Sequence, residues 1–309
     1  MPANKSVAPG GPAVSVIIAT YNRGEILCQT MAMALAQDYT DFEVIVVDQS
    51  PEPPEAVQRF VQNAGSRLKY IRRETPNLPA ARNAGVRAAQ GEIVVFIDDD
   101  VVIEPDFAAS HLRHYSDDQV GCVTGPALPP DERSEQEVLA QQLRLFNVTK
   151  NLDDGCCLVE WGAGCNFSFR KTAFLKAGMS DVRFSGGWAE DADLCVRIRH
   201  QGYVIVFDPR VRLIHLALRS GGCAFRESSD EERRRAEQCR MYLFLNVKNW
   251  TAIGTPMVMR NLWFAYRNYA LNRDLLRAPA RLLFRQGRFM LNLMKSARMC
   301  FDSPLSAHE

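Results

Sequence analysis

The chain has 309 residues, a formal net charge of +1, an apolar fraction of 47% and a charged fraction of 24%. These values are typical of a globular protein with a sizeable core. They exclude a general nucleic-acid-binding protein, which would carry a large positive charge. The nine cysteines form no C-x-x-C pair, which argues against a zinc or redox motif and favours a reducing compartment.

Residues 1–13 are rich in Pro, Gly and Ala and lack the apolar centre of a signal peptide, so we expect a flexible leader. No stretch of about 18 residues is apolar without a charge. We therefore expect no membrane span and a cytoplasmic protein.

Residues 14–118 alternate strand patterns with helix patterns, with Asn22 as an expected N-cap and Gly91 as an expected C-cap. Continuous β-branched runs indicate strands that are buried on both faces. The alternation predicts an α/β, Rossmann-like fold with a mixed, mostly parallel central sheet. The expected strands cover residues 14–20, 42–50, 68–73 and 92–100.

The pattern is less regular over residues 119–230, where we expect five further strands and a helix that opens after several glycines. Leu194, Val196 and Ile198 should supply the apolar contacts of that helix. We expect residues 14–230 to form one domain with a helical, basic appendage over residues 231–309.

Asp98, Asp99 and Asp100 end the fourth expected strand. A single Asp is a common turn residue, but three adjacent carboxylates repel one another unless they are solvated or paired with a cation. Asp48 and Thr20 end two other expected strands. Ligands bind beyond the carboxyl ends of such strands, so these polar groups predict one binding crevice.

The segment from Lys248 to Cys300 contains many Arg and Lys residues and Asp274 as its only acid, and it is rich in aromatic residues. Two interpretations stay open. The segment is either a helical cap with solvated arginines or a surface that lies against anionic lipid headgroups on the inner face of the plasma membrane. Pro256 and Pro279 should break any long amphipathic helix.

Five motifs occur in an order that resembles family 2 glycosyltransferases with the GT-A fold, over roughly residues 14–220. Their combination is far more specific than any one of them. The motifs are ATYNR (19–23), VVDQS (46–50), NLPAARNAG (77–85), IDDD (97–100) and WAEDADLCVR (188–197).

The resemblance implies a nucleotide-binding half over residues 14–118 and an acceptor half over residues 119–230. Asp100 would contact a divalent metal, Mn²⁺ or Mg²⁺, and His215 would be a further ligand; a lone histidine on an apolar strand is otherwise a core residue. The donor nucleotide-binding residues implied are Ala19, Thr20, Tyr21, Asp48, Asn77, Arg82, Asp98 and Asp99. For Arg82, the alternative is a surface cation near a helix start.

In the same resemblance Asp191 is the base that removes the proton of the acceptor hydroxyl. Glu190, Trp188 and Gly187 would bind the acceptor or its sugar. The alternative for Glu190 and Asp191 is an acidic first helical turn that complements the helix dipole.

The resemblance therefore implies an inverting, metal-dependent glycosyltransferase (EC 2.4) that uses a UDP-, dTDP- or GDP-sugar and a glycan or lipid-linked acceptor, in the synthesis of surface polysaccharide or glycolipid. The chain lacks the Q-x-x-R-W motif of processive members, so a single addition is implied. The alternatives are a non-catalytic nucleotide-sugar or glycan-binding protein and a nucleotidyltransferase. The sequence identifies neither the sugar nor the acceptor.

Overall fold

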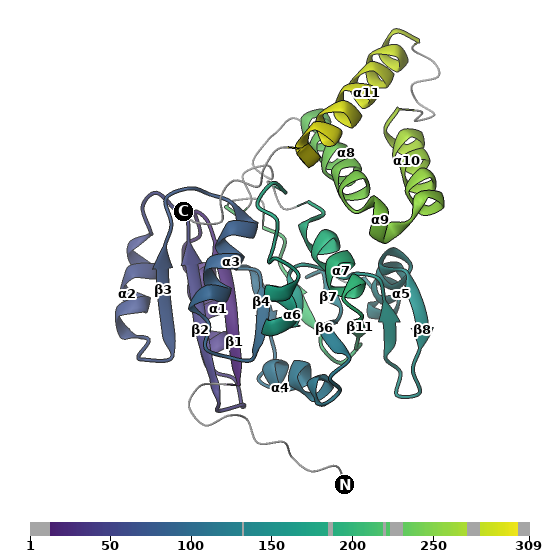
Figure 1. The fold of residues 1–309 in the computed structure, drawn as a ribbon. Helices are drawn as coiled ribbons and strands as arrows, with labels where there is room; N and C mark the ends of the chain where they lie inside the picture. Colours follow the sequence, from purple (N-terminus) through teal and green to yellow (C-terminus); the bar gives the residue numbers. More distant parts are fainter. Residues whose placement is uncertain are drawn as a thin grey trace.

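The computed structural model describes residues 13–131, 133–184, 188–218, 221–222, 231–270 and 279–301. At its centre is a nine-stranded sheet in the order β3-β2-β1-β4-β10-β6-β11-β9-β8 (Figure 1). Strands β1 to β4 are parallel, whereas β10 runs antiparallel between β4 and β6. This confirms the expected mixed α/β fold with a helical C-terminal region.

Most strands of this sheet correspond to buried apolar runs in the sequence, whereas β8 is exposed. The strands are β1 (Val14–Thr20), β2 (Phe42–Asp48), β3 (Leu68–Arg72), β4 (Ile93–Ile97), β6 (Val120–Thr124), β8 (Val148–Asn151), β9 (Cys157–Val159), β10 (Asn166–Arg170) and β11 (Val204–Phe207). A second, three-stranded sheet consists of β5 (Val101–Ile103), β12 (Leu213–His215) and β7 (Ala127–Leu128).

Helices cover both faces of the large sheet, which explains why its central strands are almost entirely buried. One face packs against α1 (Glu25–Leu35), α2 (Glu55–Asn63) and α4 (Phe107–Leu112), and α4 continues into the 3₁₀ helix η1 (Arg113–Ser116). The other face packs against α3 (Leu78–Ala88), α5 (Glu135–Phe146), α6 (Lys171–Lys176) and α7 (Glu190–His200).

The strand register brings the predicted polar residues to one edge. Thr20 pairs with Asp48 across β1 and β2, and Ile18 of β1 pairs with Ile97 of β4. The residues that follow the carboxyl ends of these three strands therefore lie next to one another at the same edge of the sheet.

Two predicted caps are wrong. Asn22 has a left-handed backbone with φ 53°, and α1 begins only at Glu25 with Gly24 as its N-cap. Helix α3 ends at Ala88 with Ala89 as its C-cap. Gly91 instead allows the chain to pass β1 closely, because a Cβ at this position would lie 2.7 Å from the backbone N of Ser15.

Helix α7 packs largely as expected. Leu194 and Ile198 are buried, but Val196 is only half-buried. Cys195 takes the third core position, since it lies on the same side of the helix as Leu194 and Ile198.

The C-terminal helices are α8 (Glu231–Lys248), α9 (Trp250–Ile253), α10 (Thr255–Ala270) and α11 (Pro279–Phe301), and they lie beyond α7 (Figure 1). Pro256 and Pro279 stand in the first turns of α10 and α11, which agrees with their predicted effect as helix breakers. Within the described ranges, none of the helices combines the length and apolar character that a membrane crossing requires.

A buried polar network joins α8 to α7. Lys248 Nζ lies 2.9 Å from Asp193 and 2.6 Å from Asp181, and Asn249 Nδ2 donates to Asp193 Oδ1 at 2.8 Å. Burial would raise the pKa of Asp181, but Arg183 and Lys248 outweigh it and lower the pKa. The helical region is therefore anchored on the helix that begins with Glu190.

Candidate functional site

Asp98, Asp99 and Asp100, which we call the donor-side carboxylates, lie at the end of β4 and differ in their partners. Asp99 is buried, and its two carboxylate oxygens accept hydrogen bonds from Thr20 Oγ1 at 2.7 Å and Arg23 Nε at 3.0 Å. Burial raises the pKa of Asp99 to about 6, although Arg23 opposes the shift. Asp99 thus ties β4 to the loop after β1.

Asp100 meets more positive charge than Asp99. It lies 3.2 Å from His215 Nε2 and 3.1 Å from Arg23, and it accepts a hydrogen bond from the backbone N–H of Leu218 at 2.8 Å. Burial alone would raise the pKa of Asp100, but His215, the Leu218 N–H and Arg23 lower it below its usual value. This carboxylate is therefore held in its charged form.

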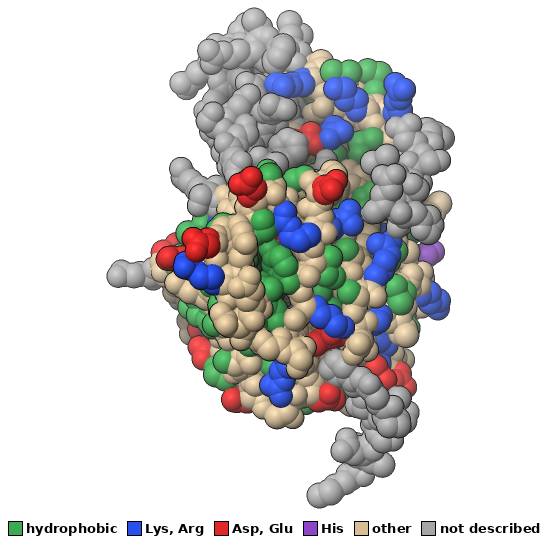
Figure 2. Space-filling view, turned by 90° about the vertical axis from the view of Figure 1, so that its left-hand side faces the viewer, with side chains coloured by type: hydrophobic (Ala, Val, Ile, Leu, Met, Phe, Trp, Pro, Cys, Tyr) green, Lys and Arg blue, Asp and Glu red, His purple; other side chains and the backbone are tan. Residues whose placement is uncertain are grey.

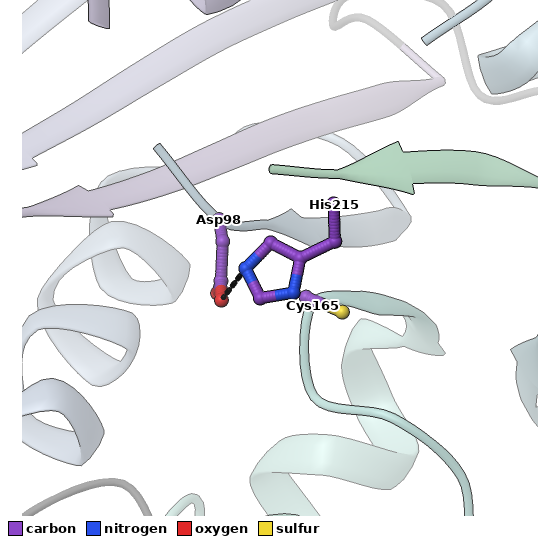
Figure 3. A group of neighbouring side chains, drawn as sticks. All are labelled: Asp98, Cys165 and His215. Atoms are coloured by element: carbon purple, nitrogen blue, oxygen red, sulfur yellow. Dashed lines mark ion pairs between the residues drawn. The ribbon is translucent and has the colours of Figure 1, made fainter. Parts of the chain in front are cut away.

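His215 and Asp98 face one another across the site (Figure 3). His215 Nε2 lies 3.5 Å from Asp98 Oδ2, and Cys165 lies against the same pair. One ligand atom from each of the three residues lies within 4.8 Å of the other two. The predicted metal ligands Asp100 and His215 are thus brought together with Asp98, and Cys165 is an addition that the sequence patterns did not indicate.

Arg82 connects the donor-side carboxylates with α7. It lies 3.5 Å from Asp98 and 3.3 Å from Glu190, and it donates to the carbonyl oxygen of Gly164 at 2.8 Å. Its side chain is 7% exposed, so the interpretation as a surface cation is wrong. The guanidinium also lies over the ring of Phe96, which favours a fixed orientation.

Glu190 and Asp191, which we call the α7 carboxylates, start helix α7. Burial and the charge of Asp191 raise the pKa of Glu190 to about 7, although Arg82 opposes the shift. Glu190 Oε2 is buried without a hydrogen-bond partner among the described residues. Burial also raises the pKa of Asp191, against the backbone N–H of Ala192, Arg82 and the N–H of Gly164.

Asp191 is aimed by backbone groups. Its Oδ2 accepts from the N–H of Gly164 at 3.1 Å, and its Oδ1 accepts from the N–H of Ala192 at 2.7 Å. A Cβ on Gly164 would lie 3.1 Å from Asp191 Oδ2, so the close approach favours glycine at this position. Each carboxylate oxygen keeps a further lone pair for a proton.

Asp48 lies at the end of β2, beside the segment Ala19–Tyr21. Its carboxylate accepts from the backbone N–H and the hydroxyl of Ser50 and from the hydroxyl of Tyr70, and Arg72 lies 3.5 Å away. These groups fix the carboxylate in place at the edge of the sheet.

Asn77 caps helix α3. Its side-chain oxygen accepts from the N–H of Ala80 at 2.9 Å, while its backbone N–H donates to Gln49 at 2.6 Å. The direct partners of Asn77 are thus structural, and its predicted role in nucleotide binding stays a prediction.

Gly187 lies outside the described residues, so its predicted role stays a prediction. Trp188 is half-buried, packs near Phe184 and Phe244, and has a buried indole N–H without a hydrogen-bond partner among the described residues. A hydrogen-bond acceptor on a bound molecule would be a suitable partner for that N–H.

Two contributors escaped the sequence reasoning. Arg23 was visible only as a letter of the ATYNR motif, and nothing local shows that it is buried beneath Asp99 and Asp100. The pairing of Lys248 with Asp193 joins residues 55 positions apart. Only a record of paired changes across relatives would have signalled it.

Comparison with known proteins bears on this arrangement. The family model described as glycosyl transferase family 2 matches residues 15–177, just over half of the chain. An uncharacterised protein of Sinorhizobium fredii is 30% identical over 244 residues, which cover 73% of this chain and 26% of that protein. A glucosyl-dolichyl phosphate glucuronosyltransferase of Haloferax volcanii is 27% identical over 220 residues, which cover 65% of this chain and 68% of that protein.

Among solved structures, a mannosyltransferase of Pyrobaculum calidifontis in complex with GDP-Man and Mn²⁺ has a TM-score of 0.60 at 18% identity. The likeness covers 97% of this chain and 89% of that one. At this identity the likeness concerns the fold.

Proposed function

Since the chain belongs to glycosyl transferase family 2 and is a transferase, we propose that it moves a single sugar from a nucleotide-sugar donor to an acceptor hydroxyl with inversion. The observation that carries the proposal is the pairing of Arg82 with both Asp98 and Glu190. A donor bound against the first carboxylate and an acceptor bound against the second would meet beside one fixed guanidinium.

The donor-side carboxylates suit a divalent metal. Carboxylate oxygens and an imidazole nitrogen converge at Asp98, Asp100 and His215, and this donor set fits Mn²⁺ or Mg²⁺. Such a metal would neutralise charge on the leaving diphosphate as a Lewis acid. Asp100 and His215 would hold it, Asp98 would contact the donor ribose or sugar, and Asp99 would position the loop through Thr20 and Arg23.

The nucleotide would lie against the neighbouring strand ends. Asp48 is fixed to accept a hydrogen bond from the base, and Ala19, Thr20 and Tyr21 would line the base pocket. The relative's complex with GDP-Man supports a nucleotide-sugar donor here, and the base, whether of a UDP-, dTDP- or GDP-sugar, is left to the binding experiment below.

Asp191 would take the proton from the acceptor hydroxyl while the hydroxyl oxygen bonds to the anomeric carbon and the nucleoside diphosphate leaves with the bonding electrons. The raised pKa of Asp191 makes it a better proton acceptor than an ordinary aspartate. Glu190 and Trp188 would contact the acceptor, and we propose the same role for Gly187.

We further propose a glycan or lipid-linked acceptor in surface polysaccharide or glycolipid synthesis, reached from the cytoplasmic face of a membrane. The relative that acts on glucosyl-dolichyl phosphate supports the lipid-linked class. Exposed apolar side chains on α10 and α11 also support it: Met259, Trp263, Met290 and Met294 are 53–59% exposed. Figure 2 shows Lys and Arg side chains beside hydrophobic ones at the height of these helices.

The first experiment is calorimetric titration with UDP, GDP and dTDP, each with Mn²⁺ and with chelator. We expect one nucleotide to bind with Mn²⁺ and to lose its affinity with chelator. Metal-dependent binding without any transfer to any acceptor would instead favour a non-catalytic binding protein. Nucleotide affinity that is the same with Mn²⁺ and with chelator would overturn the metal assignment.

Vesicle flotation tests the membrane contact. The double variant Trp263→Ser, Met294→Ser should bind anionic vesicles more weakly than the wild type and keep its nucleotide affinity. The matched control is Leu145→Ser, Leu175→Ser, which removes exposed apolar side chains from α5 and α6. Equal losses in both double variants, or none in either, would refute the proposed membrane surface.

A further inference from the structure

Cys165 lies beside two residues of the proposed donor site. It comes from the loop before β10, whereas Asp98 follows β4 and His215 ends β12 (Figure 3). The sulfur, a carboxylate oxygen of Asp98 and a ring nitrogen of His215 lie within 4.8 Å of one another. Cys165 is 8% exposed, and the side chains of His215 and Asp98 are 17% and 20% exposed. The three donor atoms thus meet at a partly accessible place.

The chemistry of this donor set differs from that of the carboxylates alone. Mg²⁺ and Mn²⁺ prefer oxygen ligands and gain little from sulfur. Zn²⁺, Co²⁺ and related cations bind a thiolate, an imidazole and a carboxylate in tetrahedral sites, commonly with three protein ligands and one open position. The Irving–Williams order also places Zn²⁺ and Co²⁺ above Mn²⁺ for one set of ligands.

We propose that Asp98, Cys165 and His215 form a site for a thiophilic divalent cation of the Zn²⁺ class. Because the site shares Asp98 and His215 with the proposed donor site, such a cation competes with Mn²⁺-dependent donor binding. The inference rests on the proposed function for this competition, but the cation binding itself needs no donor. Zn²⁺ is therefore expected to inhibit transfer at concentrations at which Mn²⁺ supports it.

Two nearby arginines pair with carboxylate oxygens other than the one that faces His215. Arg82 lies 3.5 Å from Asp98 Oδ1, whereas the oxygen that faces His215 is Oδ2. Arg23 pairs with Asp99 and Asp100.

A second cluster provides a comparison within the same chain. His114, Cys156 and Asp208 also place their ligand atoms within 4.8 Å of one another. There, however, Arg210 lies 2.8 Å from Asp208 and donates to the sulfur of Cys156 at 3.1 Å. A guanidinium thus already pairs with two of the three ligands, and we expect this cluster to bind no metal.

The test is a Co²⁺ titration of the full chain without nucleotide, followed by the thiolate-to-cobalt absorption in the near ultraviolet. We expect one equivalent of Co²⁺ to produce the band in the wild type and in Cys156→Ser. Cys165→Ser should lose the band and bind Co²⁺ at least about tenfold more weakly, with unchanged Mn²⁺ affinity. A band that survives in Cys165→Ser, or that is absent from the wild type, would overturn the inference.

A second measurement on the wild type covers the case in which Cys165→Ser does not fold. Zn²⁺ should protect Cys165 from alkylation by iodoacetamide, as read by mass spectrometry, while Mg²⁺ should not. Equal alkylation with both ions would contradict the proposed ligand. Failure of nucleotide binding with an intact cobalt band would count against the proposed function and leave the cation site standing.

Discussion

The donor-side carboxylates and the α7 carboxylates are both buried acidic groups, yet they are held in different ways. Arg23, in the loop after β1, pairs with Asp99 and Asp100. His215, at the end of β12, pairs with Asp100. Glu190 and Asp191 share Arg82 with Asp98. Cations lower the pKa of Asp100, although burial raises that of Asp99, whereas the pKa values of Glu190 and Asp191 are both raised.

This difference suits the two halves of the proposed transfer site to different tasks. A compensated carboxylate keeps its charge and suits the binding of a cation. A buried carboxylate with little compensation suits the uptake of a proton near neutral pH. The α7 side also depends on support from outside the sheets, because Lys248 of α8 pairs with Asp193, two residues beyond Asp191.

The largest expected effect separates Asp191 from Glu190. Asp191→Asn should reduce transfer by about 10²–10⁴-fold, because the hydroxyl proton loses its acceptor, and should leave nucleotide affinity unchanged. The matched variant is Glu190→Gln, for which we expect a smaller loss. Steady-state kinetics with both variants would reverse the assignment if Glu190→Gln proved the more damaging.

The second effect concerns the support of α7. Lys248→Met removes the cation that Asp193 and Asp181 share, while Arg197 and Arg183 stay paired with them, so the free energy of unfolding should fall by about 1.5–3 kcal/mol. Urea unfolding measures it, with Lys295→Met on the exposed part of α11 as control. Equal stability of the two variants would show that α8 does not support α7.

The third expected effect is a loss of metal-dependent nucleotide binding when Asp100, one of the donor-side carboxylates, is changed. Asp100→Asn should weaken Mn²⁺-dependent nucleotide binding at least about tenfold, because a metal ligand loses its charge. Glu104→Gln makes the same change of charge at an exposed position nearby and should have no effect. Unchanged affinity in Asp100→Asn by calorimetry would remove Asp100 from the metal site.

The smallest effect is the pH dependence. Since the pKa of Glu190 is raised to about 7 and that of Asp191 is also raised, the base is protonated on acidification. The transfer rate should therefore fall on acidification, by about tenfold per pH unit below the pKa of the base for one proton. In Glu190→Gln the fall should move to lower pH, because Asp191 loses its negative neighbour. An unmoved profile would argue that Asp191 does not titrate in this range.

Sequence patterns predicted the strand ends near Asp98, Asp99 and Asp100, which we call the donor edge, better than they predicted the contacts around helix α7. The strands that end at Thr20, Asp48 and Ile97 are local apolar runs, and parallel strands bring their carboxyl ends together whatever the rest of the chain does. The short strands β5, β7 and β8 were missed, because two to four residues carry too little periodicity.

The supports of the site were not predictable in the same way. The burial of Arg23, the position of Cys165 and the pairing of Lys248 with Asp193 each depend on contacts between distant segments. The failed cap at Asn22 has a related cause, since the loop after β1 is held by the N–H of Gly222, which donates to the carbonyl of Tyr21 at 2.9 Å.

The link between α7 and α8 also sets an order of events while the chain is being synthesised. The donor edge, up to the contact of Asp100 with Leu218, is encoded before residue 219. Asp193 gains Lys248 and Asn249 only after a further 30 residues have left the ribosome. A nascent chain is thus expected to complete the contacts of Asp99 and Asp100 before Asp193 gains its later partners, so the start of α7 would be the last part of the proposed site to be supported.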